Sequence, residues 1–592
     1  MLLKEVLIEV ILHLEIRRTV LLIIAAVLLP RQEAAIRAEA VVPDLLIAAV
    51  AVPVHQVVAV EVEVVAEEDK HEQQKTKIMI KKGMIAVCGL MLAMAANAQN
   101  AYDAERLLSN DLNGTARFVG MGGAMGALGG DMSVMGTNPA GIGIFRSNDF
   151  SVSMGFNNTA TESSFNGTSM KEDKTRASFD QLGFVYTYKV GNNTSLRYVN
   201  FGFNYHKNKN FNRLFSAGGQ LNGFSQSWQL AQDMANAGVN SATTFDNILN
   251  SDNPYREYWN QYPVLGVLGA TTGVVDYYDG MLGWDGYSNN FYSEERGGIN
   301  QYDFNVAFNI EDRIYLGATL GIYDVNYDRF TSYTEELNDD YGDENGGYTL
   351  DNYYGLKGAG VDLKLGVIVR PVEESPFRLG FAIHTPTWYE LTESYNATLS
   401  SDILAYDSPY DQTLSDHLNS NYLTYDYCMI TPWKFNVSAG TTLGGLVAVG
   451  AEYEYADYSS SKLEDMDGYE LGDQATVESF LKGVHTFRVG MEARLAPQFS
   501  VRAGYNYTSA AFTEDAYSAL PLYRTSTDFN NIKDKNTVTF GLGYRGNVVY
   551  ADLAYKYDMY KSDFYAFDDI DLPATKVDNS RNQLVFTLGA RF

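Results

Sequence analysis

Apolar and polar residues alternate, in segments of about ten residues, from Asp149 to the C-terminus of this chain. In Tyr302–Ile310 every second residue is apolar, and Phe499–Tyr507 carries Phe, Val, Ala, Tyr and Tyr on one face. A period of two places successive side chains on opposite faces of a β-strand. About fourteen such segments occur, with starts near residues 149, 176, 195, 299, 313, 354, 376, 430, 446, 484, 498, 536, 548 and 582.

The connections between these segments alternate between short and long. The short ones are Gly191–Asn193, Glu311–Arg313, Pro371–Pro376, Leu443–Gly445, Ala496–Gln498 and Arg545–Asn547. Short turns at one end and long loops at the other are typical of outer-membrane barrels. The sequence therefore predicts an all-β fold, a 14-stranded antiparallel transmembrane β-barrel over residues 149–592. Its longest extracellular loop would run from about 209 to 298 and include a helix near Ser225–Ala237.

The N-terminal region differs from the rest of the chain. Residues 1–82 contain no Gly, Ser, Asn, Phe, Tyr or Trp, so they lack both turn formers and aromatic core residues. Two interpretations remain: an unusual extension, or translation that truly starts later, at Met79 or Met84. We favour the second and treat residues 1–78 as a mis-annotated or non-structural extension.

Residues 79–98 have the parts of a secretory signal peptide. Lys81 and Lys82 form a positive region, Gly83–Ala95 a short apolar stretch, and Ala96-Asn97-Ala98 a cleavage site. We expect the mature protein to begin near Gln99. N-terminal sequencing of membrane fractions should then find no peptide from Val41–Val65, and finding one would contradict this start.

The C-terminus ends on a strand, in which Leu584, Phe586, Leu588, Ala590 and Phe592 alternate to the last residue. This resembles the recognition strand of outer-membrane proteins, with Phe592 as the assembly signal. The expected location is the outer membrane of a Gram-negative bacterium, where the partners would be lipopolysaccharide, outer-membrane lipid and the barrel assembly machinery.

Charge and cysteine content exclude some classes of protein. The formal net charge is −29, so the chain lacks the basic surface that neutralises nucleic-acid phosphates. Cys88 falls within the signal peptide and leaves Cys428 as the single cysteine of the mature chain. No cysteine-based metal site or internal disulfide can then form. The histidines of the mature chain fit no zinc or nucleophile motif, so we expect neither an enzyme nor a metal or other cofactor.

Residues 99–148, between the signal peptide and the first strand, are rich in glycine. They include Gly120–Gly130 and then Asn138-Pro139-Ala140-Gly141. Glycine permits irregular backbone close to other chain, and irregular backbone at membrane depth is tolerated only inside protein or a wet cavity. These residues therefore suggest a hatch folded into the barrel lumen.

The Asn138-Pro139-Ala140-Gly141 motif, after a glycine-rich run and before the first strand, resembles the hatch of the FadL/OmpP1/TodX family. The family transports long-chain fatty acids and other hydrophobic compounds across the outer membrane. The resemblance implies a passive channel in which external loops collect a ligand, an apolar pocket in the upper barrel holds it, and the hatch opens a route. It implies hydrophobic small molecules as the transported partners.

The resemblance leaves a second function open, because relatives on this scaffold act as protein-secretion shuttles or attachment components. For the channel, we expect residues 138–141 to form the gating motif. Flexible apolar side chains nearby are candidates for ligand contact, although packing against the wall explains them at least as well: Met121, Met125, Met132, Met135 and Phe145.

Overall fold

The computed structural model describes residues 101–251, 258, 261–338, 344–403, 412–414, 423–516 and 525–592. The chain divides into two units, residues 1–85 and 86–592, and every described residue belongs to the second. The extension 1–78, the signal peptide 79–98 and the expected mature terminus Gln99 all lie outside the described residues.

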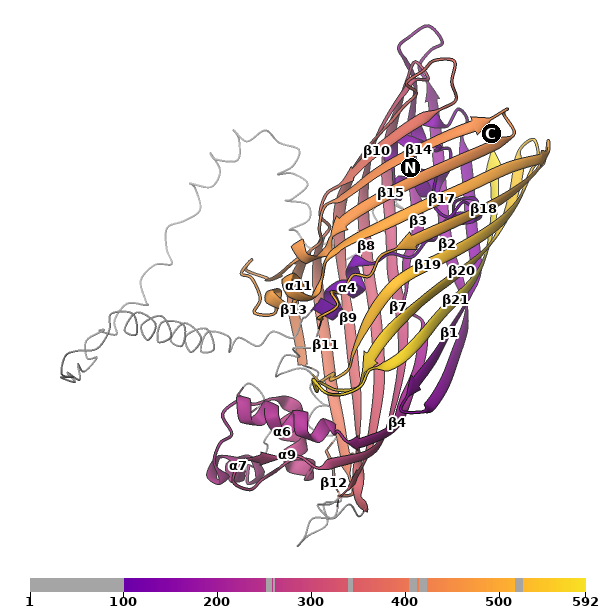
Figure 1. Ribbon diagram of the computed structural model, residues 1–592. Coiled ribbons are helices and arrows are strands. Elements are labelled where there is room, and N and C mark those ends of the chain that lie inside the picture. Colours follow the sequence, from indigo (N-terminus) through magenta and orange to yellow (C-terminus); the bar gives the residue numbers. More distant parts are fainter. Residues whose placement is uncertain are drawn as a thin grey trace, which may run out of the picture. The chain divides into compact units, whose positions relative to one another are not determined.

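Within the described residues, fourteen antiparallel strands close into a barrel (Figure 1). Three of them are interrupted, so that two labelled segments make one barrel strand. In chain order the strands are β1 (Asp149–Phe165), β2 (Thr168–Lys189), β3 (Leu196–Asn210) with β4 (Arg213–Gly223), β7 (Asp285–Ile310), β8 (Ile314–Asn338), β9 (Glu344–Val369), β10 (Arg378–His384) with β11 (Trp388–Ser401), β13 (Leu423–Ile430) with β14 (Lys434–Leu443), β15 (Val447–Asp457), β17 (Gly483–Ala496), β18 (Phe499–Thr508), β19 (Phe529–Arg545), β20 (Val549–Tyr565) and β21 (Thr575–Arg591).

The barrel closes where its last strand pairs with its first. Phe150 lies opposite Ala590 and Phe156 opposite Leu584. Asn148 and Phe592 exchange backbone hydrogen bonds of 3.0 and 3.1 Å at the end of this seam. The β-barrel predicted from the sequence is confirmed, and the terminal Phe592 completes its last ladder.

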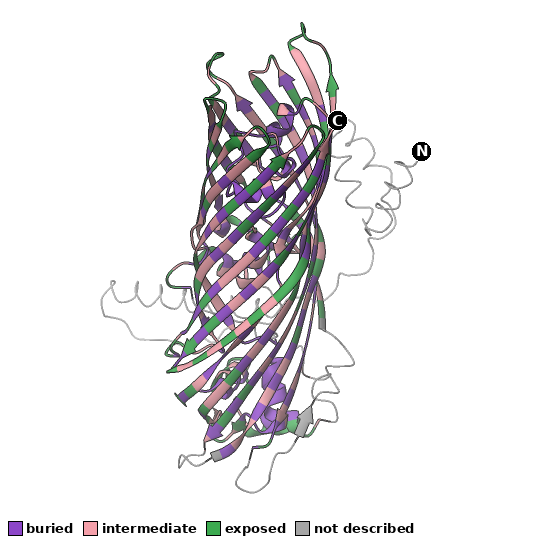
Figure 2. Cartoon of the chain, turned by 90° about the vertical axis from the view of Figure 1, so that its right-hand side faces the viewer, coloured by how far each residue is buried: buried purple, intermediate pink, exposed green. Residues whose placement is uncertain are grey.

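Outward and inward residues alternate as predicted, which Figure 2 shows as green and purple bands along the strands. Phe304 and Phe308 of β7 point outward, and Asp303, Asn305 and Asn309 are buried inside. Because a closed ladder pairs the backbone of every strand, the apolar outer face can meet lipid while the inner face stays polar.

Prolines explain two of the interrupted strands. Pro386 separates β10 from β11 and Pro432 separates β13 from β14. Proline has no N–H to donate to a ladder. The two breaks lie side by side and threonine bridges them: Thr387 N donates to Thr431 Oγ1 at 2.8 Å, and Thr431 N to Thr387 O at 3.1 Å.

A helical cap fills most of the longest connection. It contains α6 (Gln226–Asn236), α7 (Ala242–Leu249), α9 (Val264–Thr272) and the hairpin of β5 (Asp276–Tyr277) and β6 (Met281–Leu282). The predicted helix near 225–237 is confirmed by α6, which Ser225 caps by accepting from Ser227 N. The connection is shorter than the loop expected over 209–298, because β4 and the first part of β7 lie within that span.

Smaller elements lie in the other long connections: β12 (Gln412–Leu414), η4 (Tyr458–Ser460), β16 (Lys462–Asp465) and α11 (Gln474–Phe480). Within the described part of the chain, no helix has the length and apolar character needed to span a membrane.

Residues 101–148, called here the N-terminal segment, pack against inward residues of the barrel strands; Figure 1 draws them in indigo among those strands. The segment has two short α-helices, α4 (Ala101–Leu108) and α5 (Ala116–Gly120), and two 3-10 helices, η2 (Met132–Gly136) and η3 (Pro139–Ile144). Most of its side chains are buried, and they pack against inward residues of many strands.

Candidate functional site

The N-terminal segment lies on the barrel wall at positions where the strands carry glycine. A Cβ atom at Gly450 would lie 2.1 Å from Ala124 O, and one at Gly490 would lie 2.1 Å from Met121 O. These distances are too short for any side chain, so the segment can approach only because the side chains are missing. We call the wall positions that face it the glycine belt: Gly317, Gly366, Gly380, Gly440, Gly450, Gly490, Gly504 and Gly541.

Strand register makes this belt continuous over part of the wall. Gly440 of β14 pairs with Gly450 of β15, which pairs with Gly490 of β17, which pairs with Gly504 of β18. Neighbouring strands lie about 4.8 Å apart. The row therefore forms a strip without side chains across four strands, and residues 121–128 of the segment lie along it.

The Asn138-Pro139-Ala140 motif forms a tight turn against two more belt glycines. Asn138 caps η3, and its Oδ1 accepts from Ala140 N at 3.2 Å. A Cβ at Gly366 would lie 2.1 Å from Asn138 Oδ1, and one at Gly317 would lie 2.4 Å from Pro139 C. Gly317 and Gly366 are register partners on β8 and β9, so the turn sits in a notch shared by two strands.

Polar contacts fix the same segment to side chains of β15, β17, β18 and β20, beside the glycine strip. Arg117 Nε lies 2.9 Å from Glu492 Oε2, and Arg502 bridges Glu492 to Asp552 with two contacts of 2.6 Å. Gly126 N donates to Glu452 Oε2 at 2.9 Å. On these strands the segment is thus held both by backbone fit and by polar contacts that include ion pairs.

The four candidate methionines and Phe145 are buried between the segment and the wall. They share one apolar cluster with Phe118, Leu128, Val134 and Ile142, and the methionines are at most 2% exposed. Met135 lies against Gly202 of β3, where a Cβ would lie 2.3 Å from its Cε. In this arrangement they pack the segment, and ligand contact by them requires the segment to move.

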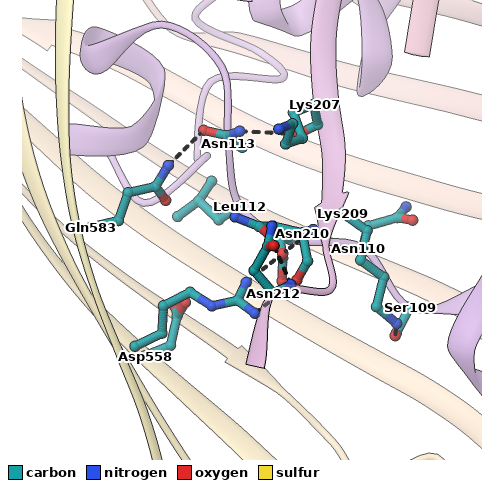
Figure 3. A network of polar contacts seen from close by, with 12 residues as sticks. Ser109, Asn110, Leu112, Asn113, Lys207, Lys209, Asn210, Asn212, Asp558 and Gln583 are labelled. Carbon is teal, nitrogen blue, oxygen red and sulfur yellow. Dashed lines mark hydrogen bonds and ion pairs between the residues drawn. The ribbon is translucent and has the colours of Figure 1, made fainter. Parts of the chain in front are cut away.

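Within the segment, residues 109–113 contact β3 at the point where that strand bends (Figure 3). Asn113 Nδ2 donates to Lys207 O and to Asp180 Oδ1, each at 3.0 Å, and Gln583 Nε2 donates to Asn113 Oδ1 at 3.1 Å. Asp111 accepts from Asn210 N at 3.0 Å and pairs with Arg581 at 2.5 Å. The bent strand and the segment therefore support each other.

At the same bend β3 leaves its neighbour β2. The β2–β3 ladder ends at the pair Gln181–His206, and in the described part of the chain Thr168–Phe179 of β2 pair with β1 alone. Beyond the bend, the carbonyls of Leu214 and Ser216 on β4 accept from inward hydroxyls of β1 instead. The wall ladder is interrupted here, at the height where outward Phe179 still belongs to the apolar face.

The lumen above the belt holds a polar cavity of about 120 Å³. Lys364, on its wall, is paired to Asp362 at 2.6 Å and to Asp303 at 3.4 Å. His384 Nε2 lies 2.9 Å from Thr137 O of the segment. A space of this size and polarity suits a few water molecules, so it is not the expected apolar pocket.

An aromatic cluster lies in the upper lumen, and α4 fills it. Ala101, Ala104, Leu107 and Leu108 of α4 are buried there among rings from β8, β9, β11, β13 and the β15–β17 connection: Tyr323, Tyr327, Tyr354, Tyr389, Tyr395, Tyr427 and Tyr458. Tyr458 OH donates to Leu108 O at 3.0 Å, and Lys209 Nζ to Arg106 O at 2.8 Å.

The helical cap rests on a buried carboxylate of β8, more than twenty residues above the periplasmic turn. Glu335 accepts from Tyr333 OH at 2.5 Å, Tyr348 OH at 2.9 Å and Gln226 N at 3.1 Å. Burial raises the pKa of Glu335 to about 7, since loss of hydration disfavours its charged form. Nearby, Arg329 of β8 is paired with Asp528, which precedes β19 across the lumen.

The closed ladder, the apolar outer face and the occupied polar lumen define a transmembrane β-barrel of the type found in the outer membrane of Gram-negative bacteria. Searches with family models and against curated proteins found no match. The barrel fold itself is similar to that of solved structures.

One is the toluene transporter TodX of Pseudomonas putida, at 14% identity and a TM-score of 0.44, covering 81% of this chain and 99% of that one. Another is a FadL homologue of Pseudomonas aeruginosa, at 12% identity and 0.45, covering 82% and 99%. A third is the toluene transporter TbuX of Ralstonia pickettii, at 16% and 0.39, covering 81% and 99%.

Two of these neighbours are named as toluene transporters. The names TodX and FadL also occur in the name of the family that the sequence resembles. At such identities and TM-scores the likeness carries no argument about activity. The fold stands on the strand pairing described above.

Proposed function

We propose that the protein is a passive outer-membrane channel for hydrophobic molecules, such as long-chain fatty acids, gated by the N-terminal segment as a hatch. One observation carries this proposal: the segment is seated on the wall through its own backbone, against glycines. Along the glycine belt the segment can separate from the wall without unpacking interlocked side chains at those positions. The substrate class follows from the family resemblance in the sequence.

The proposed route leaves the lumen where β2 and β3 part. Hydrogen-bond pairing stops at Gln181 and His206, and the segment residue Asn113 fills the gap with its own hydrogen bonds. Movement of residues 109–113 would open the wall at the height of the outer lipid leaflet. A hydrophobic molecule would then pass sideways into lipid beside the polar cavity, which residues 109–113 help to line.

Motion of the hatch would also expose the candidate ligand contacts. Met121, Met125, Met132 and Met135 are flexible and polarizable, which suits variable apolar ligands. We propose that they, with Phe145, line the space vacated beside the glycine belt. The helical cap would collect ligand outside, lipopolysaccharide and lipid would surround the barrel, and Phe592 would present the chain to the assembly machinery.

The direct test compares full-length protein with a deletion of residues 99–136. In planar bilayers the deletion should raise conductance to small polar ions, because the lumen loses its plug. Substitution of both Asn138 and Pro139 by Ala should reduce hydrophobic-ligand uptake more than assembly. A deletion that changes neither conductance nor uptake would refute the hatch.

The second candidate function is a protein-secretion shuttle or attachment component on the same scaffold. The helical cap is the feature that favours it, because helices whose buried residues pack into one cluster with the barrel strands present a defined surface. Mass spectrometry of small molecules extracted from the purified barrel separates the two functions. A bound apolar compound supports transport, whereas stable co-purification with a secretion machine supports the second function.

A further inference from the structure

A guanidinium of the chain occupies an aromatic site in the upper lumen. Arg106 of α4 has its Cζ 4.5 Å from the ring centre of Tyr327 and 5.8 Å from that of Tyr354. Tyr327 is fully buried and Tyr354 is 6% exposed. The two rings meet edge to face, with centres 6.0 Å apart. A cation at this distance from two ring faces is attracted by their electron-rich π systems.

Each ring also donates its hydroxyl to a buried or half-buried carboxylate. Tyr327 OH lies 3.2 Å from Glu295 Oε2, and Tyr354 OH lies 3.2 Å from Glu393 Oε2. A phenol that donates to a carboxylate gains electron density in its ring, so the attraction for a cation increases. We call these four residues the cation cage.

All members of the cage belong to the barrel wall, on β7, β8, β9 and β11. The cage therefore persists when α4 moves, whereas Arg106 and its helical partner Asp103, at 2.6 Å, leave together. Two ring faces and two carboxylates would then surround an empty position of the right charge for a cation.

Apolar surface adjoins this position. Ala104, Leu107 and Leu108 of α4 occupy the same aromatic cluster, beside Leu356, Leu391 and Met429. A ligand that replaced α4 would need a cationic head for the cage and an apolar body for the cluster. The side chain of Arg106 and the apolar face of α4 already have these two properties.

Other features of the molecule favour cations as well. Lumenal rings face cations elsewhere: Lys364 lies 5.3 Å from the Tyr323 ring and Arg213 lies 5.0 Å from the Phe215 ring. The net charge of −29 concentrates cations near the protein.

We propose that the cation cage is a binding site for amphiphilic organic cations, such as alkyl- or arylalkyl-guanidines and amines, and that α4 occupies it as an internal competitor through Arg106. This rests on the proposed channel and names a substrate class for its upper lumen. The competing explanation is that Arg106 only anchors α4.

The test uses full-length protein in lipid nanodiscs and two matched probes. Phenethylguanidinium is planar and cationic, and phenethylurea has nearly the same shape without the charge. Isothermal titration would compare wild type with Arg106→Gln. We expect Arg106→Gln to bind the guanidinium about tenfold more tightly than wild type does, with no such gain for the urea.

A triple variant, Arg106→Gln with Tyr327→Leu and Tyr354→Leu, should lose the gain, because the ring faces are gone. Arg296→Gln is the matched control, since it removes an exposed arginine paired to Glu294 on the outer side of β7 and should behave as wild type. Heat-modifiability on gels would verify that every variant is folded.

If Arg106→Gln shows no preference for guanidinium over urea, Arg106 is an anchor and the inference is wrong. Conductance of the 99–136 deletion is measured separately. A conducting deletion together with no guanidinium preference would keep the channel and reject the cage, and the reverse result would keep the cage and reject the hatch.

Discussion

Glycine at inward wall positions decides how closely the N-terminal segment can approach. At Gly366 even a methyl group would lie 2.1 Å from Asn138 Oδ1 and 3.0 Å from Pro139 Cδ. Strand register aligns such glycines on neighbouring strands, as at Gly317 and Gly366. The segment thus fits against the wall because each of these wall positions lacks a side chain.

We therefore predict that Gly366→Ala displaces the Asn138-Pro139-Ala140 turn while the barrel still assembles. The strand position itself tolerates alanine, so the strain falls on the turn. Single-channel recording should show more frequent openings. Gly136→Ala is the control, because its Cβ would meet nothing closer than 3.5 Å. Equal gating by both variants would show that the notch does not hold the turn.

Glu335 makes docking of the helical cap depend on pH. Its pKa is raised from 4.5 to about 7 by burial, so the folded state holds the proton more tightly than the unfolded state. This contribution to stability is complete below about pH 4.5 and is lost as pH rises through about 7. The full difference is roughly 3 kcal/mol.

Hydrogen exchange of the α6 amides should accordingly be slower at pH 5 than at pH 8, after correction for the intrinsic rates. Glu335→Gln should remove part of this dependence. Asp233 of α6, facing Asp568, has a pKa raised by burial to about 7 as well, so Glu335→Gln with Asp233→Asn should remove the rest. An unchanged profile in the double variant would place the titrating group elsewhere.

At the scale of elements, the alternation of apolar and polar residues is clearest in the strands near the periplasmic turns. We predict that Phe304→Arg and Phe308→Arg each impair folding, since Arg costs roughly 2–4 kcal/mol at the bilayer midplane. Both side chains are exposed on the outer face. Phe304→Leu is the matched control and should fold normally in a lipid-vesicle refolding assay. Unimpaired folding of both Arg variants would mean that β7 faces the other way.

Strand boundaries were predictable at one end of the barrel and not at the other. Starts expected near residues 313 and 498 occur at Ile314 and Phe499, after short turns. Starts expected near 299 and 354 occur at Asp285 and Glu344. The second pair begins far above the lipid, where no apolar face is required and the alternation fades although the backbone ladder continues.

The content of the lumen was only partly predictable. Asn138-Pro139-Ala140 indicated a turn, and the glycine run Gly120–Gly130 indicated close backbone approach. The matching glycines on the wall were visible in the sequence as recurrent inward glycines, for example at 440, 450, 490 and 504. Their alignment into one row depends on the strand register, however, and the sequence alone does not give that register. Arg106 and the cation cage that it occupies bring together residues nearly 300 positions apart, so no local pattern could indicate this site.

At the scale of the whole molecule, the barrel and the N-terminal segment are separable, because the described residues of the segment form no strand of the barrel ladder. Ring closure comes from β1 and β21, and among the described residues each of the fourteen barrel strands pairs with both neighbours over at least part of its length. Loss of the segment would destabilise the barrel mainly through electrostatics, because inward charged side chains would lose their partners. Most of those charges are also paired within the wall: Arg502 keeps Glu492 and Asp552, and Lys556 keeps Asp558 at 3.3 Å.

We therefore predict that the barrel lacking residues 99–136 still inserts and keeps its heat-modifiable mobility on gels. Arg581, which loses Asp111, would gain water in the vacated lumen, and a solvated charge costs little. The melting temperature should fall, because the apolar cluster around Met121 and Met125 loses its packing. The control is the full-length Arg117→Ala variant, which weakens one anchor and keeps the packing, so its melting temperature should lie between those of wild type and the deletion. Failure of the deletion variant to insert would show that the segment is needed to build the wall it later closes.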